Sequence, residues 1–282
     1  KLLMEFSIPA IIGMVVNTLY NIVDRMYIGN IKDIGGLALT GVGITMPIMT
    51  IIMAFGMLIG IGTSARISLK LGEHKREEAE KHLGNAFTLI IIASVLITII
   101  GLVFMHKILG LFGASADTEI YAREYMQIIF FGTIFNMLSF GLNHSIRSDG
   151  SPKVAMLSML IGAGTNIILD PIFIFVFGMG VRGAAIATVI SQIVSTIWIL
   201  YYFTKGKSNL KIKREYLSLD KAIVLSIFSI GVSPFSMQIA QSIVQVLANN
   251  ALKTYGGDLA IGAMTIINSV AMIFMMPIAK SP

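Results

Sequence analysis

The sequence of 282 residues has no cysteine and few charged side chains. Without cysteine the chain forms neither disulfides nor thiolate metal sites, and the redox compartment stays open. Charged residues make up only 13% of the chain against 55% hydrophobic residues, which is too apolar for an ordinary soluble domain. No spacing typical of a metal site is found among the four histidines His74, His82, His106 and His144. The composition therefore predicts a membrane protein and argues against metal catalysis.

Apolar runs long enough to cross a bilayer recur along the chain. A membrane-crossing helix needs about 20 predominantly apolar residues. Such runs lie near 6–24, 38–63, 84–105, 124–145, 154–177, 182–203, 221–250 and 259–279. Their length and the lack of short alternating strands favour helices. The sequence predicts an all-α polytopic membrane protein with about eight transmembrane helices.

The longest polar stretch, 204–220, divides six predicted helices from two. We expect it to be a cytoplasmic linker between a complete six-helix N-terminal lobe, 1–203, and the first two helices of a second lobe, 221–282. Aligning 7–25 with 232–250 supports a repeat, because Pro9 matches Pro234 and Asp24 matches Asn249. The chain starts without Met and stops at the close of an apolar run, so we expect a fragment of a longer protein.

The positive charges predict an orientation. If the N-terminus is cytoplasmic, the cytoplasmic side holds 15 of the 21 Lys and Arg residues, including Lys1 and Lys280, whereas the other side holds six, including Arg25. The net charge of +6 is therefore explained by the excess of Lys and Arg in the predicted cytoplasmic loops. The sequence has no basic stretch interleaved with aromatics that would indicate nucleic-acid binding. The charged segment 70–86 predicts a short amphipathic helix along the cytoplasmic surface.

Two acidic residues, Asp24 and Asp170, fall at bilayer depth, where ionisable side chains are costly and usually functional. From the helical rise, both lie in the outer half of the membrane, at the level of Thr188. Polar stripes at helical spacing comprise Asn17, Tyr20, Asn21 and Asp24; Gly162, Asn166 and Asp170; and Thr188, Ser191, Gln192 and Ser195. Such stripes face the bundle or a wet cavity, where they either serve transport or hold helices together.

Two carboxylates that meet in a low dielectric should share a proton or hold a small cation. Asn166 and Thr188 offer neutral oxygens of the kind that sodium prefers, but protons need only the carboxylates, so both coupling ions stay open. Pro171 should kink its helix and leave the Ile167 carbonyl without its usual partner, and Pro9 is either a first-turn proline or a bend. Further cavity-lining residues are predicted at Asn136, Asn143, Gln238, Gln241, Gln245 and Asn249.

Several of these motifs occur together in one known family. Pro9 and then Asp24 in the first helix, "NHSIRSDGSPKVAM" at 143–156, "NIILDPIFIF" at 166–175 and "GVRGAAIATVISQ" at 180–192 stand in the order and spacing of that family. The chain resembles the multidrug and toxic compound extrusion (MATE) transporters, particularly the branch close to the staphylococcal-type multidrug exporters.

The resemblance implies a non-enzymatic antiporter with twelve helices in two six-helix lobes. It would expel small organic, often cationic compounds across the cell membrane in exchange for sodium or protons, without another cofactor. By the same match, Asp24, Asn166, Asp170 and Thr188 would form the cation site, and Pro9 would be a bend linked to its occupancy.

Three other functions remain to be distinguished. A lipid-linked oligosaccharide flippase of the same broad superfamily should have a basic central cavity. A membrane-embedded enzyme needs a catalytic set within the spans, for which His144 is the only nearby histidine. A passive channel would conduct without exchange, so collapse of the ion gradient would not stop efflux.

Overall fold

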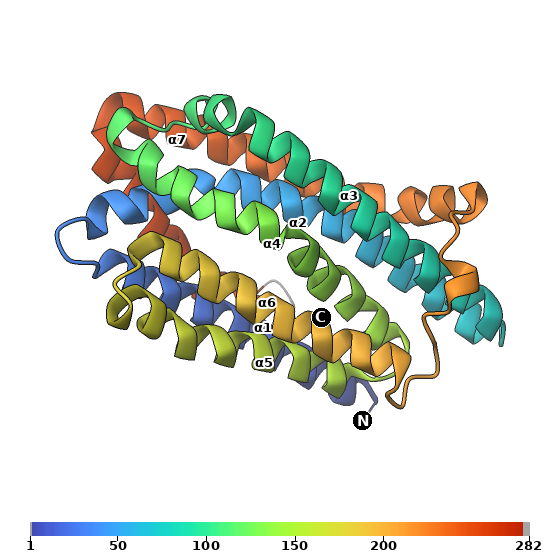
Figure 1. The fold of residues 1–282 in the computed structure, drawn as a ribbon. Coiled ribbons are helices and arrows are strands. Elements are labelled where there is room, and N and C mark those ends of the chain that lie inside the picture. Colours follow the sequence, from blue (N-terminus) through green and yellow to red (C-terminus); the bar gives the residue numbers. More distant parts are fainter. Residues whose placement is uncertain (1, 279–282) are drawn as a thin grey trace.

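The computed structural model describes residues 2–278, and every regular element in that range is helical. The elements are α1 (Leu2–Gly29), α2 (Gly35–Gly72), α3 (Arg76–Leu111), α4 (Ala116–Ser148), α5 (Pro152–Pro171), a π-helical segment (Ile172–Val176), α6 (Gly180–Thr204), a short 3₁₀ segment (Arg214–Tyr216) and α7 (Lys221–Ile278). The long helices run alongside one another in an elongated bundle (Figure 1). By length and composition, six helices of the described range could cross a membrane, namely α2 to α7, with α5 counted together with the π-helical segment. The predicted all-α polytopic fold is confirmed in this form.

Helix α7 is two helices joined at a sharp kink. Gly257, with φ 72° and ψ −175°, is its non-helical residue, and glycine adopts such a positive φ without the steric cost that a side chain would bring. The kink falls between the predicted spans 221–250 and 259–279. The end of the second span lies outside the described residues, and so do Lys1 and Lys280. Helix α7 therefore consists of two helical parts, 221–256 and 258–278, which meet at Gly257.

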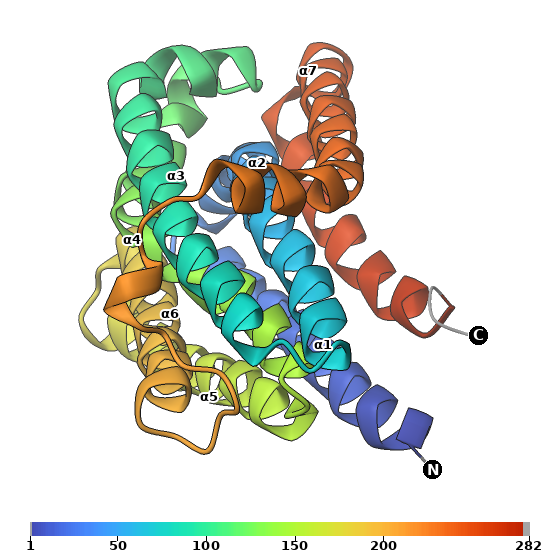
Figure 2. The same ribbon diagram turned by 90° about the vertical axis from the view of Figure 1, so that its right-hand side faces the viewer.

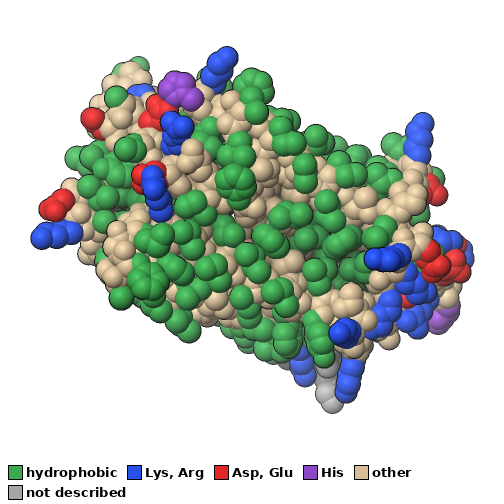
Figure 3. All heavy atoms as spheres, viewed as in Figure 1, with side chains coloured by type: hydrophobic (Ala, Val, Ile, Leu, Met, Phe, Trp, Pro, Cys, Tyr) green, Lys and Arg blue, Asp and Glu red, His purple; other side chains and the backbone are tan. Residues whose placement is uncertain are grey.

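The surface carries a broad apolar belt. On the face drawn in Figure 3, hydrophobic side chains cover the middle of the molecule, whereas Lys, Arg, Asp, Glu and His gather towards its two ends. Large apolar side chains along this belt are strongly exposed, among them Val103 at 70%, Phe131 at 69% and Val176 at 75%. Their exposure is explained if lipid covers the belt and water covers the ends.

Helix α2 lies at the centre and packs against both α4 and α7. A Cβ atom added at Gly60 would lie 2.8 Å from the Gly141 Cα of α4, so the two backbones approach closely because both residues lack a side chain. Figure 2 shows α7 beside α2 and apart from α5 and α6. Helix α2 therefore separates the α1–α5–α6 group, which holds all four residues of the predicted cation site, from much of α7.

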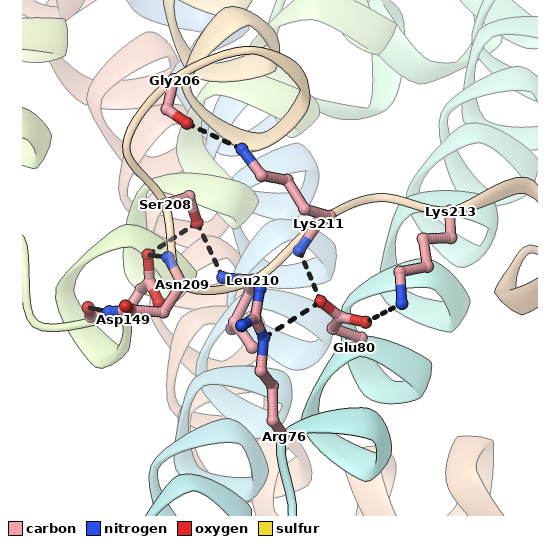
Figure 4. A network of polar contacts seen from close by, with 9 residues as sticks. All are labelled: Arg76, Glu80, Asp149, Gly206, Ser208, Asn209, Leu210, Lys211 and Lys213. Atoms are coloured by element: carbon pink, nitrogen blue, oxygen red, sulfur yellow. Dashed lines mark hydrogen bonds and ion pairs between the residues drawn. The ribbon is translucent and has the colours of Figure 1, made fainter.

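The segment 205–220, called the strap here, connects α6 to α7 and is fixed to the ends of α3 and α4 (Figure 4). At one anchor, the Asp149 carboxylate accepts hydrogen bonds from Ser208 Oγ at 2.6 Å and from the Asn209 N–H at 3.1 Å. The Tyr202 hydroxyl donates to the same carboxylate oxygen at 2.6 Å. Asp149 is buried, and these donors compensate the burial of one of its carboxylate oxygens, whereas the other, Oδ1, has no hydrogen-bond partner.

The second anchor of the strap is the buried Glu80 of α3. Its carboxylate accepts from the Lys211 N–H at 3.2 Å and pairs with Lys213 Nζ at 2.7 Å, and Arg76 Nε lies at 3.5 Å (Figure 4). The hydrogen bond with Glu80 raises the pKa of the Lys213 ammonium group. Two buried carboxylates thus give the polar strap a defined path.

The predicted surface helix over 70–86 is wrong. Helix α2 continues to Gly72, and α3 begins at Arg76 and runs unbroken from the charged segment into the apolar span. The strap covers the first turns of α3, where Thr88 Oγ1 donates to the Leu217 carbonyl at 2.7 Å. These turns pack against protein, which removes the reason for a separate helix lying on the membrane surface.

Candidate cation site

Three helices bring the predicted site residues together in the bundle. Asp24 comes from α1, Asn166 and Asp170 from α5, and Thr188 from α6; all four are buried, with Asn166 and Asp170 fully so. Asn166 and Asp170 share one face of α5 because they lie four residues apart. Asn166 Nδ2 donates to Asp170 Oδ1 at 3.0 Å and lies 3.4 Å from Thr188 Oγ1.

The cluster has more oxygen atoms than hydrogen-bond donors. The Asp24 and Asp170 carboxyl groups lie close enough to interact directly with each other. Within the part of the chain that the structure describes, one oxygen each of Asp24, Asn166 and Asp170 is buried without a hydrogen-bond partner. Unpartnered buried oxygens are costly. A bound proton or a small hard cation would satisfy them.

Pro171 changes the helix directly after Asp170. Helix α5 ends at Pro171, and the next five residues, Ile172–Val176, form the π-helical segment. Proline has no N–H to donate to the Ile167 carbonyl, and π-helical turns often accompany functional sites. The carboxylate therefore lies where the backbone departs from regular α-helix.

Pro9 is buried inside α1, which begins at Leu2. The alternative that Pro9 is a first-turn proline is therefore wrong, because the helix has already formed two turns before it. Helix α1 stays a single helix through Pro9.

Sequence reasoning missed Tyr125 of α4. This tyrosine is 5% exposed, its hydroxyl interacts with the Thr188 side chain, and it lies near Tyr20, Asp24 and Asp170. At the start of the predicted span 124–145, a tyrosine resembles an interfacial aromatic residue. The packing of α4 against α6, rather than any local pattern, carries it to the site.

The predicted loop position of Arg25 is wrong. The charge count placed it in an outer loop, but α1 continues to Gly29 and Arg25 is 8% exposed. The side chain lies within the bundle and points to the second part of α7, where its guanidinium donates to Ser269 and Thr265. One basic residue thus occupies the interior directly after Asp24.

Comparison with known proteins establishes the family. The MatE family matches residues 9–172, more than half of the chain. The chain belongs to the MATE family. Among MATE relatives, the multidrug export protein MepA of Staphylococcus haemolyticus (strain JCSC1435) is 32% identical over 258 residues, which cover 91% of this chain and 56% of that protein. MepA of Staphylococcus aureus (strain MRSA252) is 30% identical over the same shares. The chain thus spans a little over half the length of the curated MATE relatives it matches.

Solved MATE structures share the fold. The multidrug transporter DinF-BH in complex with rhodamine 6G gives a TM-score of 0.93 at 39% identity, covering 98% of this chain and 62% of that chain. An inward-facing MATE transporter of the MOP superfamily gives 0.89 at 31% identity, covering 99% and 63%. The predicted resemblance to MATE transporters is therefore confirmed.

The remaining polar residues predicted for the MATE cavity are spread over four helices. Asn17, Tyr20 and Asn21 are half-buried on α1, and Asn21 Nδ2 donates to the Asn17 carbonyl at 2.7 Å. Asn143 joins α4 to α5 through bonds to the Ala155 carbonyl at 2.9 Å and Ser158 Oγ at 2.7 Å. Gln245 Oε1 accepts from Thr50 Oγ1 at 3.2 Å, and Asn249 Nδ2 lies 3.5 Å from the Phe112 carbonyl. Gln241 is exposed, and the others are half-buried: Asn136, Gln192 and Gln238.

Proposed function

We propose that the full protein is a secondary-active multidrug exporter that expels organic, often cationic compounds in exchange for sodium or protons. The observation that carries this proposal is the pair of buried carboxylates, Asp24 and Asp170, in which one oxygen of each and the neighbouring Asn166 oxygen have no hydrogen-bond partner. The names of the relatives support it, since the MepA proteins are multidrug exporters by name and DinF-BH was solved with rhodamine 6G.

The proposed topology has eight crossings in this part of the protein. Helix α1 and both parts of α7 would cross the cell membrane together with the five helices between them. The N-terminal lobe would be 1–203, and 221–282 would begin the second lobe. The linker between them, 204–220, which contains the strap, would lie in the cytoplasm with the N-terminus. The charged ends and apolar belt of the surface support this arrangement.

In the proposed mechanism, the acidic site binds and releases the coupling ion. Asp24 and Asp170 would hold the coupling ion, and Asn166 and Thr188 would add neutral oxygens if that ion is sodium. A transporter couples ion and drug only if the loaded and empty sites favour different conformations. Pro9 and Pro171 would allow α1 and α5 to bend, and the polar residues of α1, α4, α6 and α7 would line the drug path.

Gradient-driven dye efflux tests this function in the full-length protein. Rhodamine 6G serves as the probe, and Asp24→Asn and Asp170→Asn are compared with wild type under a sodium gradient and under a proton gradient. Removing a buried charge that binds the coupling ion should slow efflux by about tenfold or more. The matched control is Asp117→Asn, which changes an exposed aspartate of α4. Full efflux in both site variants would exclude the carboxylates from the mechanism, and efflux that persists without any gradient would indicate a passive channel.

A further inference from the structure

Arg25 forms a direct polar link between α1 and the second part of α7. Its guanidinium donates to the Ser269 hydroxyl and, at 3.4 Å, to the Thr265 carbonyl. A third contact, at 3.2 Å, is with Met46 Sδ of α2. Every one of these partners is neutral, and no salt bridge of the described residues includes Arg25.

A guanidinium charge at this depth requires compensation. A buried arginine in a membrane protein is costly unless it is paired or hydrogen-bonded. Ser269 and Thr265 hold the guanidinium but cannot neutralise it. The nearby negative charge belongs to Asp24, which interacts with it electrostatically from the adjacent position of α1.

Arg25 therefore stands between two competing attractions. Toward the cation site, the Asp24 carboxylate attracts it most strongly when Asp24 is ionised and no cation is bound. Toward α7, neutral hydrogen bonds hold it with a strength that does not depend on the cation. Binding of one monovalent cation removes part of the first attraction and leaves the second unchanged.

We propose that Arg25 couples occupancy of the cation site to closure of the outer end between the two proposed lobes. With the cation bound, the guanidinium stays on Ser269 and Thr265 and holds α7 against α1. With the site empty, it turns to the carboxylates and releases α7. The inference rests on the proposed function, because it requires Asp24 and Asp170 to bind the coupling ion.

Distances between spin labels test the coupling in full-length protein. This part of the chain has no cysteine, so labels are placed by Lys32→Cys and Tyr255→Cys at two exposed outer positions, with any cysteine of the remainder replaced by serine. Spectra are compared at alkaline pH without sodium, where the site is empty, and with sodium or at acidic pH, where it is loaded. In wild type the ratio of open to closed populations should change by about 5- to 150-fold, the range of ordinary allosteric coupling.

The variants separate coupling from folding. Arg25→Gln should show less than about a twofold change between the two conditions, since the charge that responds to the cation is gone. Ser269→Ala keeps the guanidinium but removes one of its two acceptors on α7 and leaves the Thr265 carbonyl, so the open population should rise in the loaded state. The matched control is Ser242→Ala, which removes a different buried hydrogen bond from α7, to the Pro47 carbonyl at 3.0 Å, and should respond like wild type.

Two outcomes overturn the coupling role. One is a wild-type response in both Arg25→Gln and Ser269→Ala, and the other is a wild-type protein that shows no response although Asp170→Asn abolishes efflux. Should Arg25→Gln fail to fold, Ser269→Ala alone decides. Failure of the proposed function itself looks different, since dye efflux would then survive in Asp24→Asn and Asp170→Asn.

Discussion

At the scale of the residue, a polar side chain inside an apolar run is informative because burial without a partner is costly. This reasoning selected Asp24 and Asp170, and the resemblance to MATE transporters added Asn166 and Thr188. The structure places all four in one buried cluster. Spacing sufficed for the pair on α5. It could not reveal Tyr125, because an aromatic residue near a helix end is equally typical of the membrane interface.

Tyr125 gives a prediction at this scale. Tyr125→Phe keeps the ring but removes the hydroxyl that interacts with Thr188. Losing this polar contact should cost no more than a buried hydrogen bond, about 0.5–1.5 kcal/mol, so the concentration of coupling ion for half-maximal efflux should rise by at most about 10-fold. Dye efflux recorded over a range of ion concentrations measures this half-maximal concentration. Tyr121→Phe, one turn earlier on α4, is the control, and equal effects of the two variants would remove Tyr125 from the site.

At the scale of the element, the chain's breaks follow from residues with special backbone properties. Pro171 ends α5 and begins the π-helical segment, and Gly257 divides α7. Both positions could be anticipated from sequence. The continuity of α3 could not, because the charged segment at its start is amphipathic in sequence and its partner, the strap, is more than 100 residues away along the chain.

The strap provides a prediction for an element. Asp149→Asn removes the charge that holds Tyr202, Ser208 and the Asn209 N–H, and hydrogen bonds to a charged group are worth about 1.5–3 kcal/mol each. The strap should loosen while the helices stay folded. Trypsin should then cut it at its lysines several times faster than in wild type, as followed by gel electrophoresis. An unchanged cleavage rate, or equal acceleration in the exposed control Asp117→Asn, would show that Asp149 does not anchor the strap.

At the scale of the whole molecule, the uneven distribution of positive charge predicts which end faces the cytoplasm. Lys32, between α1 and α2, and Lys75, between α2 and α3, are exposed at the two ends of α2. Lys32→Cys should react with a membrane-impermeant thiol reagent in intact cells. Lys75→Cys should react only after the cells are made permeable. Labelling in the reverse order would invert the proposed topology, and the cysteine-free chain is the blank.

The buried position of Arg25 also belongs to the whole molecule. The charge count placed Arg25 in a loop on the outer side. Without Arg25, that side has five positive charges instead of six, so the predicted orientation is unchanged. What it adds is a contact between distant segments, α1 and the second part of α7. Contacts of this kind require the packed bundle.

The sequence by itself determined the helical membrane fold, the positions of most helix breaks and the two carboxylates of the buried cluster, and its resemblance to MATE transporters added Asn166 and Thr188. Each of these depends on local properties: the length of an apolar run, the spacing of residues on one helix face, or the backbone of proline and glycine. Only the tertiary structure decided that Tyr125 joins the cluster, that Arg25 is held by α7 and that the strap covers α3. The physical reason is that these interactions join segments far apart in the chain, and helix packing, rather than local pattern, sets which buried polar groups meet.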